Sequence, residues 1–416
     1  ENVHWSATVG DGIGCPIVAD GRVFVSGMTG DETVTLFAYD AATGKKLWQR
    51  DWATGPLPDI HKTNSQASAT PAADGERVYF YFWTLGLLTV DAKTGADVWE
   101  QTLPIPFFVF KWGPGMSPVL YKDLVLFCQD DDLAPALYAF DKRSGELRWK
   151  DDRVDMAVNY SHPVVCTVDG RDEIVVGGTG MLIGYDPATG HRNWFAKVLL
   201  RNIKTTPVVQ DGKLDKDEIR AFVGKQPIPE AFFAKTFGRG DLNKDGFLEG
   251  RELDVAFLHP DNFAGASFES LGPKAAEERI LAVRGGGHGD VTKTHVMWMH
   301  PTKYTDHIVS PFVSEGRMFL IKCGGLTTVF DTKTGEPTRS VQRLGGGGDY
   351  FASPVAGDGK IYLASENGTV LVLKNTEDFE ELADNDLGES IVATPAISDG
   401  RLYIRTRTKL LTIGTN

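Results

Sequence analysis

Short apolar runs recur along the chain at regular intervals, and each pair of runs is separated by a turn signal. The recurring unit is a residue, usually Ser or Thr, then Pro, a short apolar run, Asp-Gly and a second apolar run. Its copies are "CPIVADGRVFV", "TPAADGERVYF", "SPVLYKDLVLF", "HPVVCTVDGRDEIVV", "TPVVQDGKL", "SPFVSEGRMFL", "SPVAGDGKIYL" and "TPAISDGRLYI". Such runs, bounded by Gly and Asp, predict pairs of short β-strands joined by tight turns.

A second recurring unit follows most of these copies. It reads "FAYDAATGKKLW", "LTVDAKTGADVW", "YAFDKRSGELRW", "IGYDPATGHRNW" and "TVFDTKTGEPTR". Each predicts a strand, a tight Asp…Thr-Gly turn and another strand, because Gly supplies the positive φ that such a turn requires. Trp48, Trp99, Trp149 and Trp194 occupy the same offset in four of the copies.

The spacing of the copies predicts the architecture. Most of the repeat prolines follow one another after 41 to 55 residues, whereas Pro207 and Pro311 are 104 residues apart. Four short strands in about 45 residues is the period of a propeller blade. Eight copies predict an all-β, eight-bladed propeller. The last copy is one strand short, and "NVHWSATV" at the N-terminus, with Trp5 at the offset of Trp48, is expected to supply that strand and close the ring.

This pattern resembles the tryptophan-docked propellers of the PQQ-like, BamB-type quinoprotein repeat family. The resemblance covers nearly the whole chain outside one insertion. It implies the propeller fold, and it implies two kinds of function that the family contains, namely quinoprotein dehydrogenases and outer-membrane assembly factors. The dehydrogenases carry an adjacent cysteine pair, which this sequence lacks along with the haem motif CxxCH, so we expect no PQQ.

The long gap between Pro207 and Pro311 predicts an insertion. We expect propeller blades in residues 1–212, a helical EF-hand-like insertion in 213–276 within blade five, and the remaining blades in 277–416. The segment "DLNKDGFLEGRE" matches a calcium-binding loop position by position. Its expected ligands are Asp241, Asn243, Asp245, the carbonyl of Phe247, Glu249 through water, and bidentate Glu252. The cofactor expected here is Ca²⁺.

A degenerate second loop lies at "PVVQDGKLDKDE", residues 207–218. Asp211, Gly212, Asp215 and Glu218 hold positions 5, 6, 9 and 12, but Pro207 and Val209 hold positions 1 and 3 and offer no ligand side chain. We expect this half-site to bind no metal and to pack against the complete loop.

Charge and composition restrict the partners. The net charge of −13 disfavours nucleic acid and anionic membranes, and no apolar run is long enough to span a bilayer. Calcium and the acidic surface favour a periplasmic or secreted protein, and the sequence printed here shows no signal peptide. The four scattered cysteines are interpreted as buried small hydrophobic residues.

A ligand site is expected at the axial mouth, on the loops that precede the repeat prolines. The candidate catalytic residues are Tyr160, His162, Lys204, Asp306 and His307, and the candidate ligand-binding residues are Asp11, His61, Lys111, Trp112, Asp349, Tyr350 and Glu389. The first hypothesis is a binding propeller whose mouth holds a glycan, a small molecule or a protein. The alternative is a carbohydrate-active enzyme, either a lyase with Tyr160, His162, Lys204 and His307 or a hydrolase with paired carboxylates.

Overall fold

The structure is a computed structural model that describes residues 3–414 with several gaps. Residues 109–111, 157–158, 179–180 and 302–308 lie outside the description, as does 198–278 apart from 213–214, 238, 241–242, 244 and 248–249. The chain divides into two compact units. Unit 1 comprises Glu1–Leu57, Lys62–Leu103 and Asp306–Asn416, and unit 2 comprises Pro58–His61 and Pro104–Thr305.

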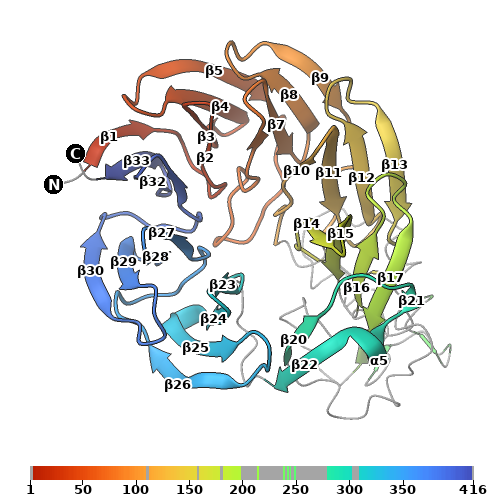
Figure 1. The fold of residues 1–416 in the computed structure, drawn as a ribbon. Coiled ribbons are helices and arrows are strands. Elements are labelled where there is room, and N and C mark those ends of the chain that lie inside the picture. Colours follow the sequence, from red (N-terminus) through yellow and green to blue (C-terminus); the bar gives the residue numbers. More distant parts are fainter. Residues whose placement is uncertain are drawn as a thin grey trace. The chain divides into compact units, whose positions relative to one another are not determined.

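Unit 1 contains five antiparallel sheets of four strands (Figure 1). In four of them the strands follow one another in hairpin order, and in the fifth β1 pairs with β33. They are β2 (Ile17–Ala19), β3 (Arg22–Gly30), β4 (Thr33–Asp40) and β5 (Lys46–Ala53); β6 (Ala72–Ala73), β7 (Arg77–Phe82), β8 (Gly86–Asp91) and β9 (Asp97–Gln101); β23 (Phe312–Ser314), β24 (Arg317–Ile321), β25 (Leu326–Asp331) and β26 (Pro337–Arg343), with the short 3-10 turn η3 (Cys323–Gly325); β27 (Val355–Gly357), β28 (Lys360–Ala364), β29 (Thr369–Lys374) and β30 (Glu381–Asp386); and β31 (Ala396–Ser398), β32 (Arg401–Arg405), β33 (Lys409–Gly414) and β1 (Val3–Thr8).

Unit 2 contains two further sheets of the same kind. They are β10 (Val119–Tyr121), β11 (Leu124–Gln129), β12 (Ala136–Asp141) and β13 (Leu147–Asp152); and β14 (Val164–Val168), β15 (Arg171–Gly178), β16 (Met181–Tyr185) and β17 (Arg192–Lys197), to which β21 (Gly289–Asp290) adds a fifth strand. Two small pairs complete the unit: β18 (Lys213–Leu214) with β19 (Leu248–Glu249), and β20 (Arg279–Val283) with β22 (Val296–Pro301), with the one-turn helix α5 (Thr292–His295) just before β22.

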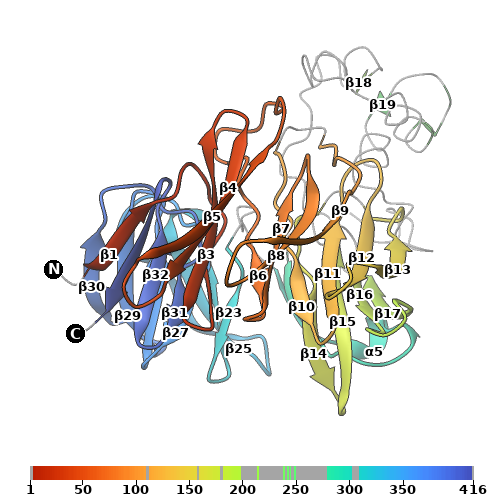
Figure 2. The same cartoon turned by 90° about the horizontal axis from the view of Figure 1, so that it is seen from above.

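The two middle strands of each sheet are apolar and buried, because adjacent sheets cover both of their faces. In β7 every residue after Arg77 is buried, whereas the outer strand β9 of the same sheet is mostly exposed. The sheets β10–β13 and β14–β17 share one core, to which Leu126, Leu137, Ile174 and Ile183 contribute (Figure 2). Packing of sheet on sheet is the arrangement of propeller blades.

The Asp…Thr-Gly turns form as the sequence predicts. In the first of them, the carboxylate of Asp40 accepts hydrogen bonds from the backbone N–H and the hydroxyl of Thr43, at 2.8 and 2.7 Å. Gly44 then adopts a φ of 71°, a conformation in which a residue with a Cβ atom would be strained. The turn therefore depends on all three residue types of the motif.

The tryptophan of the outer strand packs on the turn of the next sheet. The indole Nε1 of Trp48 donates to the carbonyl of Ala92 at 3.1 Å, and a Cβ on Gly95 would lie only 2.8 Å from the indole ring. The same arrangement is repeated by Trp5 on Ala41 and Gly44, and by Trp149 on Pro187 and Gly190. Each tryptophan thus joins one blade to the next.

Trp194 departs from this arrangement. Its Nε1 donates to the carboxylate of Glu173 in its own sheet, at 3.1 Å. The same carboxylate oxygen accepts the backbone N–H of Gly286, at 3.0 Å. The glycine-rich segment then runs on as β21, which pairs in parallel with β17 and covers the edge of that strand. A buried carboxylate here takes the place that a carbonyl of the next blade takes elsewhere.

Strand β1 completes the last sheet of unit 1 by pairing with β33, from Val3 opposite Ile413 to Thr8 opposite Lys409. The first and last strands of the described chain therefore lie side by side (Figure 1). The expected strand contributed by the N-terminus is present, with Trp5 in the docking position.

The prediction of eight blades is wrong, because the described residues form seven blade-like sheets, five in unit 1 and two in unit 2. The fifth predicted copy is described only at its last two residues, which belong to no blade sheet. Its residues Lys213 and Leu214 pair instead with Glu249 and Leu248. Backbone groups engaged in that pair are not available to a blade strand.

The predicted helical insertion over 213–276 is also wrong. The described residues of this range include the paired strands β18 and β19, and Gly238 is the one described residue there with helical structure. The helices expected next to the calcium loop lie outside the described residues.

The interpretation of the cysteines as buried small hydrophobic residues is confirmed for Cys128, which is buried and free. Cys15 and Cys166 are also free but only half-buried. The side chain of Cys323 is outside the description. In the part of the chain that is described, no helix is long and apolar enough to cross a membrane.

Candidate functional site

The candidate site residues fall into three groups. Asp11, Asp349, Tyr350 and Glu389 lie in unit 1, and His61, Trp112, Tyr160 and His162 lie in unit 2. Lys111, Lys204, Asp306 and His307 lie outside the described residues, so their predicted roles stay predictions. The two described groups are considered separately.

In unit 1, Asp11 is part of an ion pair. Its carboxylate accepts from the guanidinium of Arg407 and, at 2.7 Å, from the hydroxyl of Ser65. The second amino group of Arg407 donates to the carbonyl of Asn64 at 2.9 Å. The turn between β32 and β33 thus supplies the cation that neutralises Asp11.

Glu389 is held by the same turn. Its carboxylate accepts from the backbone N–H of Thr408 at 2.8 Å, from the Thr408 hydroxyl at 2.7 Å and from the Thr406 hydroxyl at 3.0 Å. Burial acts to raise the pKa of Glu389, but these hydrogen bonds outweigh it, so the pKa is lowered. The group is therefore an anion at neutral pH and is not poised to donate a proton.

Arg405 lies beneath this turn and is fully buried. Its guanidinium donates to the carbonyls of Gly14 and Gly10, both at 3.3 Å, and to that of Ser26. Burial lowers the pKa of Arg405 to about 10, which leaves it charged at neutral pH. Gly12 must be glycine here, because a Cβ would collide with the guanidinium and with the carbonyl of Ala67.

Tyr350 and Asp349 differ in their surroundings although they are neighbours. Tyr350 is buried in the core of its blades, and its hydroxyl donates to the carbonyl of Gly345 at 2.7 Å. Desolvation raises the pKa of Tyr350. Asp349 is exposed. Packing alone accounts for the aromatic residue at position 350.

In unit 2, Tyr160 and His162 lie on the segment that enters β14. The ring of Tyr160 stacks on Phe108, with centroids 5.5 Å apart and planes 25° apart. A Cβ on Gly115 would lie 3.1 Å from the Tyr160 ring, so the 112–116 segment also contacts it. His162 is exposed at its surface, yet desolvation by its surroundings lowers the pKa of its imidazole. The neutral imidazole is thus favoured at neutral pH.

His61 and Trp112 form a second aromatic pair in unit 2. Their ring centroids are 4.4 Å apart and their planes are tilted by 44°. Both side chains are half-buried, so part of each ring faces solvent. Half-exposed aromatic rings whose side chains also carry a polar N–H group are common in ligand-binding surfaces.

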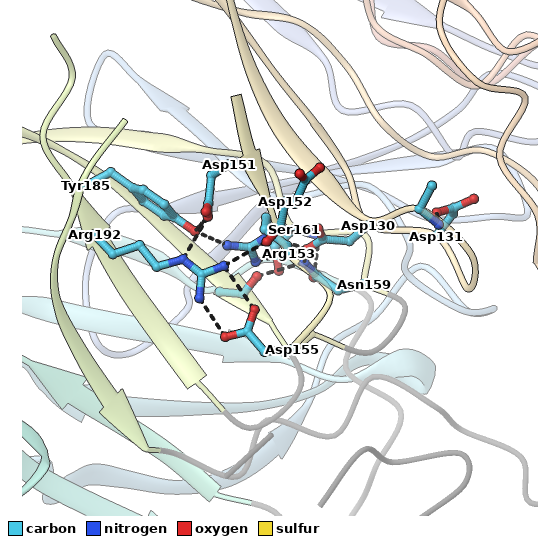
Figure 3. Close-up of polar contacts among 12 residues, drawn as sticks. Asp130, Asp131, Asp151, Asp152, Arg153, Asp155, Asn159, Ser161, Tyr185 and Arg192 are labelled. Carbon is cyan, nitrogen blue, oxygen red and sulfur yellow. Dashed lines mark hydrogen bonds and ion pairs between the residues drawn. The ribbon is translucent and has the colours of Figure 1, made fainter. Parts of the chain in front are cut away.

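A buried ion pair lies next to Asn159, the residue that precedes Tyr160 (Figure 3). Arg153 and Asp130 are both fully buried. Arg153 Nε lies 2.8 and 3.1 Å from the two carboxylate oxygens of Asp130, and Nη2 donates at 2.9 Å. Burial acts to lower the pKa of Arg153, but the charge of Asp130 outweighs it and keeps the guanidinium protonated.

The ion pair continues outward to a second arginine. Arg153 donates to the hydroxyl of Tyr185, which donates to Asp151 at 2.9 Å. Arg192 donates to the same carboxylate of Asp151 at 2.8 Å and to Asp155 at 2.9 Å. The network joins the ends of β11 and β13 to β16 and β17 (Figure 3).

Sequence reasoning missed these polar residues. The basic run at Arg405–Arg407 and the acidic run Asp130–Asp132 were the available signals. Neither signal shows a partner, because the pairs form between residues 23 to 396 positions apart. Pairing of that kind is created by the fold.

The predicted metal loop is described only in part. Asp241 is half-buried, and Glu249 lies in β19, whereas Asn243, Asp245, Phe247 and Glu252 are outside the described residues. Among the residues that are described, no group of three potential ligands gathers around one point. Leu214 pairs with Leu248, and both hold position 8 of their respective loops. The two segments therefore pair at equivalent positions, while the packing of one metal loop on the other stays a prediction.

These blades and their tryptophan-docked turns define a PQQ-like β-propeller. The chain belongs to the family described as outer membrane protein assembly factor BamB, whose model matches residues 2–108 and 111–221, which is more than half of the sequence.

Individual relatives are more distant. A quinohemoprotein alcohol dehydrogenase from Pseudomonas putida is 27% identical over 190 residues, which are 41% of this chain and 26% of that protein. The assembly factor BamB of Moranella endobia is 24% identical over 207 residues, 47% of this chain and 50% of that protein. The matched regions thus span half or less of these relatives. The crystal structure of BamB from Moraxella catarrhalis superimposes with a TM-score of 0.58 at 16% identity, covering 100% of this chain and 98% of that one, which shows a shared fold.

Proposed function

We propose that this protein is an extracytoplasmic binding propeller that holds a protein partner at its blade-entry loops and leaves it chemically unchanged. The observation that carries the proposal is the state of the described carboxylates. A general acid for glycoside cleavage needs a raised pKa. Glu389 has a lowered pKa, and Asp11 is neutralised by Arg407. Both are suited to holding loops in place.

The aromatic residues of unit 2 support a binding role. Trp112 and Tyr160 present half-buried rings on adjacent loops. Ile105, on the same loop as Trp112, is 60% exposed. Aromatic anchors surrounded by apolar side chains are typical of protein-binding surfaces. Membership in the family of an outer-membrane assembly factor favours a protein partner of the same kind.

Two alternatives are ranked lower. The tilted His61–Trp112 pair would also suit a sugar ring, so a glycan is the second candidate ligand. PQQ redox chemistry does not fit, because no two cysteines are adjacent in the sequence and the three described ones are free.

The test is a binding assay on two panels. One panel holds peptides of about ten residues with alternating apolar and polar positions, as in outer-membrane strands, and the other holds neutral and uronate-containing polysaccharides. We expect peptide binding that Trp112→Ala weakens by about tenfold or more. Trp52→Ala is the control, since Trp52 is a half-buried tryptophan on β5. Equal weakening by both variants, or new reducing ends from a polysaccharide, would refute the proposal.

We also propose that residues 241–252 bind Ca²⁺ and that this site is structural. The donor set of carboxylates, an amide and a carbonyl is the chemistry that Ca²⁺ prefers. The Leu214–Leu248 pairing supports it, because a loop held by a partner loop has less freedom to lose on binding.

Calcium titration with thermal unfolding tests the metal site. Calcium is expected to raise the unfolding temperature of the wild type but not of Glu252→Gln. The matched control is Glu218→Gln in the degenerate loop, which should respond like the wild type. A normal calcium response in Glu252→Gln would overturn the assignment.

A further inference from the structure

At least four hydrogen bonds hold Asn159, which lies one residue before Tyr160. Its side-chain amide donates to Asp130 and to the carbonyl of Gly177 in β15, both at 2.7 Å. Its side-chain oxygen accepts the backbone N–H of Ser161 at 2.7 Å. Its own backbone N–H donates to the carbonyl of Asp130 at 3.1 Å. The side chain is 1% exposed.

Asp130 is itself immobilised by the buried ion pair with Arg153. The segment from Asn159 to Ser161 is thereby tied to the end of β11 on one side and to β15 on the other (Figure 3). Tyr160 lies between two residues whose backbone N–H groups are both engaged. The ring of Tyr160 stacks on that of Phe108. His162 follows directly.

We propose that Asn159 is a positioning residue, which transmits the rigidity of the buried Arg153–Asp130 pair to Tyr160 and His162 at the proposed binding surface. This inference rests on the proposed function, because it supplies the reason for so rigid a mouth segment. A side chain held in its bound conformation loses less entropy when a partner binds. Local hydrogen bonds of this kind fix the rotamers of the groups they support.

The test has a readout that needs no ligand. The pKa of His162 is measured by NMR titration of its imidazole in the wild type, in Asn159→Ala and in Asn385→Ala. Asn385 is the control, because its amide donates a single hydrogen bond within the sheet of β30, to the carbonyl of Val370. The pKa of His162 in the wild type is expected below its ordinary value of 6.5, owing to desolvation.

In Asn159→Ala the segment is released, so the pKa of His162 should rise toward that ordinary value, while Asn385→Ala leaves it unchanged. The double variant Asp130→Asn/Asn159→Asp keeps one carboxylate and one amide and should restore part of the shift. Asn159→Ser replaces Asn159→Ala if the latter does not fold. An unchanged pKa of His162 in a folded Asn159 variant would overturn the inference.

A second readout is the affinity for the tightest peptide of the panel. Asn159→Ala should weaken this affinity on the order of tenfold, while the β10–β13 core still unfolds cooperatively. If no peptide binds at all while the pKa of His162 still rises, the proposed function fails and the positioning role stands. If peptides bind equally well to wild type and variant, the positioning role fails.

Discussion

Replacement of Arg153 by Met is the most informative perturbation of the folded state. Methionine keeps much of the volume of the side chain but removes its charge and all of its donors. The change leaves Asp130 fully buried and removes the guanidinium that donates to both of its carboxylate oxygens. Breaking a buried pair by removing one partner costs about 3–5 kcal/mol, because a buried charge is left uncompensated.

The expected effect on the melting temperature follows from that cost. For a domain of about 150–250 residues, 1 kcal/mol corresponds to roughly 2–4 °C, so Arg153→Met should melt about 6–20 °C below the wild type. Differential scanning calorimetry measures this directly. The control is Arg148→Met in the adjacent part of β13, where Arg148 is half exposed and pairs with Asp141 at 2.9 Å. An exposed pair of this kind contributes only about 0–1 kcal/mol.

A second substitution should rescue the variant, because it removes the buried charge that Arg153→Met leaves without its partner. Arg153→Met with Asp130→Leu should recover much of the loss. If Arg153→Met melts no lower than Arg148→Met, the buried pair does not stabilise unit 2 as argued.

Two further predictions concern the repeated turns. Gly95→Ala should destabilise unit 1 by about 1–3 kcal/mol, since its Cβ would meet the Trp48 ring at 2.8 Å. The control is Gly21→Ala, where φ is 70° and nothing lies within 4 Å, so only backbone strain should destabilise the protein. Thermal melts compare the two variants. The pKa values of Asp40, Asp91 and Asp331 are lowered from 3.8, chiefly by hydrogen bonds from Thr43, Thr94 and Thr334. The stabilising effect of these three carboxylates is therefore complete above pH 3.8 and is lost as the pH falls through the lower folded pKa. A triple Asp→Asn variant lacks this effect, so its melting temperature should decline less steeply below about pH 4 than that of the wild type. Parallel acid profiles of both proteins would disprove this.

Local patterns predicted the blades because each blade carries its own signals. The apolar runs, the Asp…Thr-Gly turns and the docking tryptophans are short-range features, and Trp48 on Gly95 is found as expected. The closing strand at Trp5 was recognised for the same reason. The fifth copy misled, because "VVQDGKL" has the pattern of a blade hairpin while Leu214 pairs with Leu248 instead.

The candidate site was predictable only as a set of loops. Position before a repeat proline correctly suggests a loop, but it does not say whether a side chain faces solvent. Tyr350 is buried in the core, whereas His162, on another of these loops, is exposed. The residues that hold these loops, Arg407 and Asn159, were not foreseen, because their partners lie far away in sequence.

The proposed binding function requires that the blade-entry loops of unit 2 hold a partner. Hydrogen exchange measured by mass spectrometry, with and without the tightest-binding panel peptide, tests it most directly. The account predicts slower exchange on binding in segments 104–117 and 156–163, where Trp112, Tyr160 and His162 lie, and no change in the outer strands β5 and β13. Protection confined to the outer strands, with both loop segments unchanged, would contradict it.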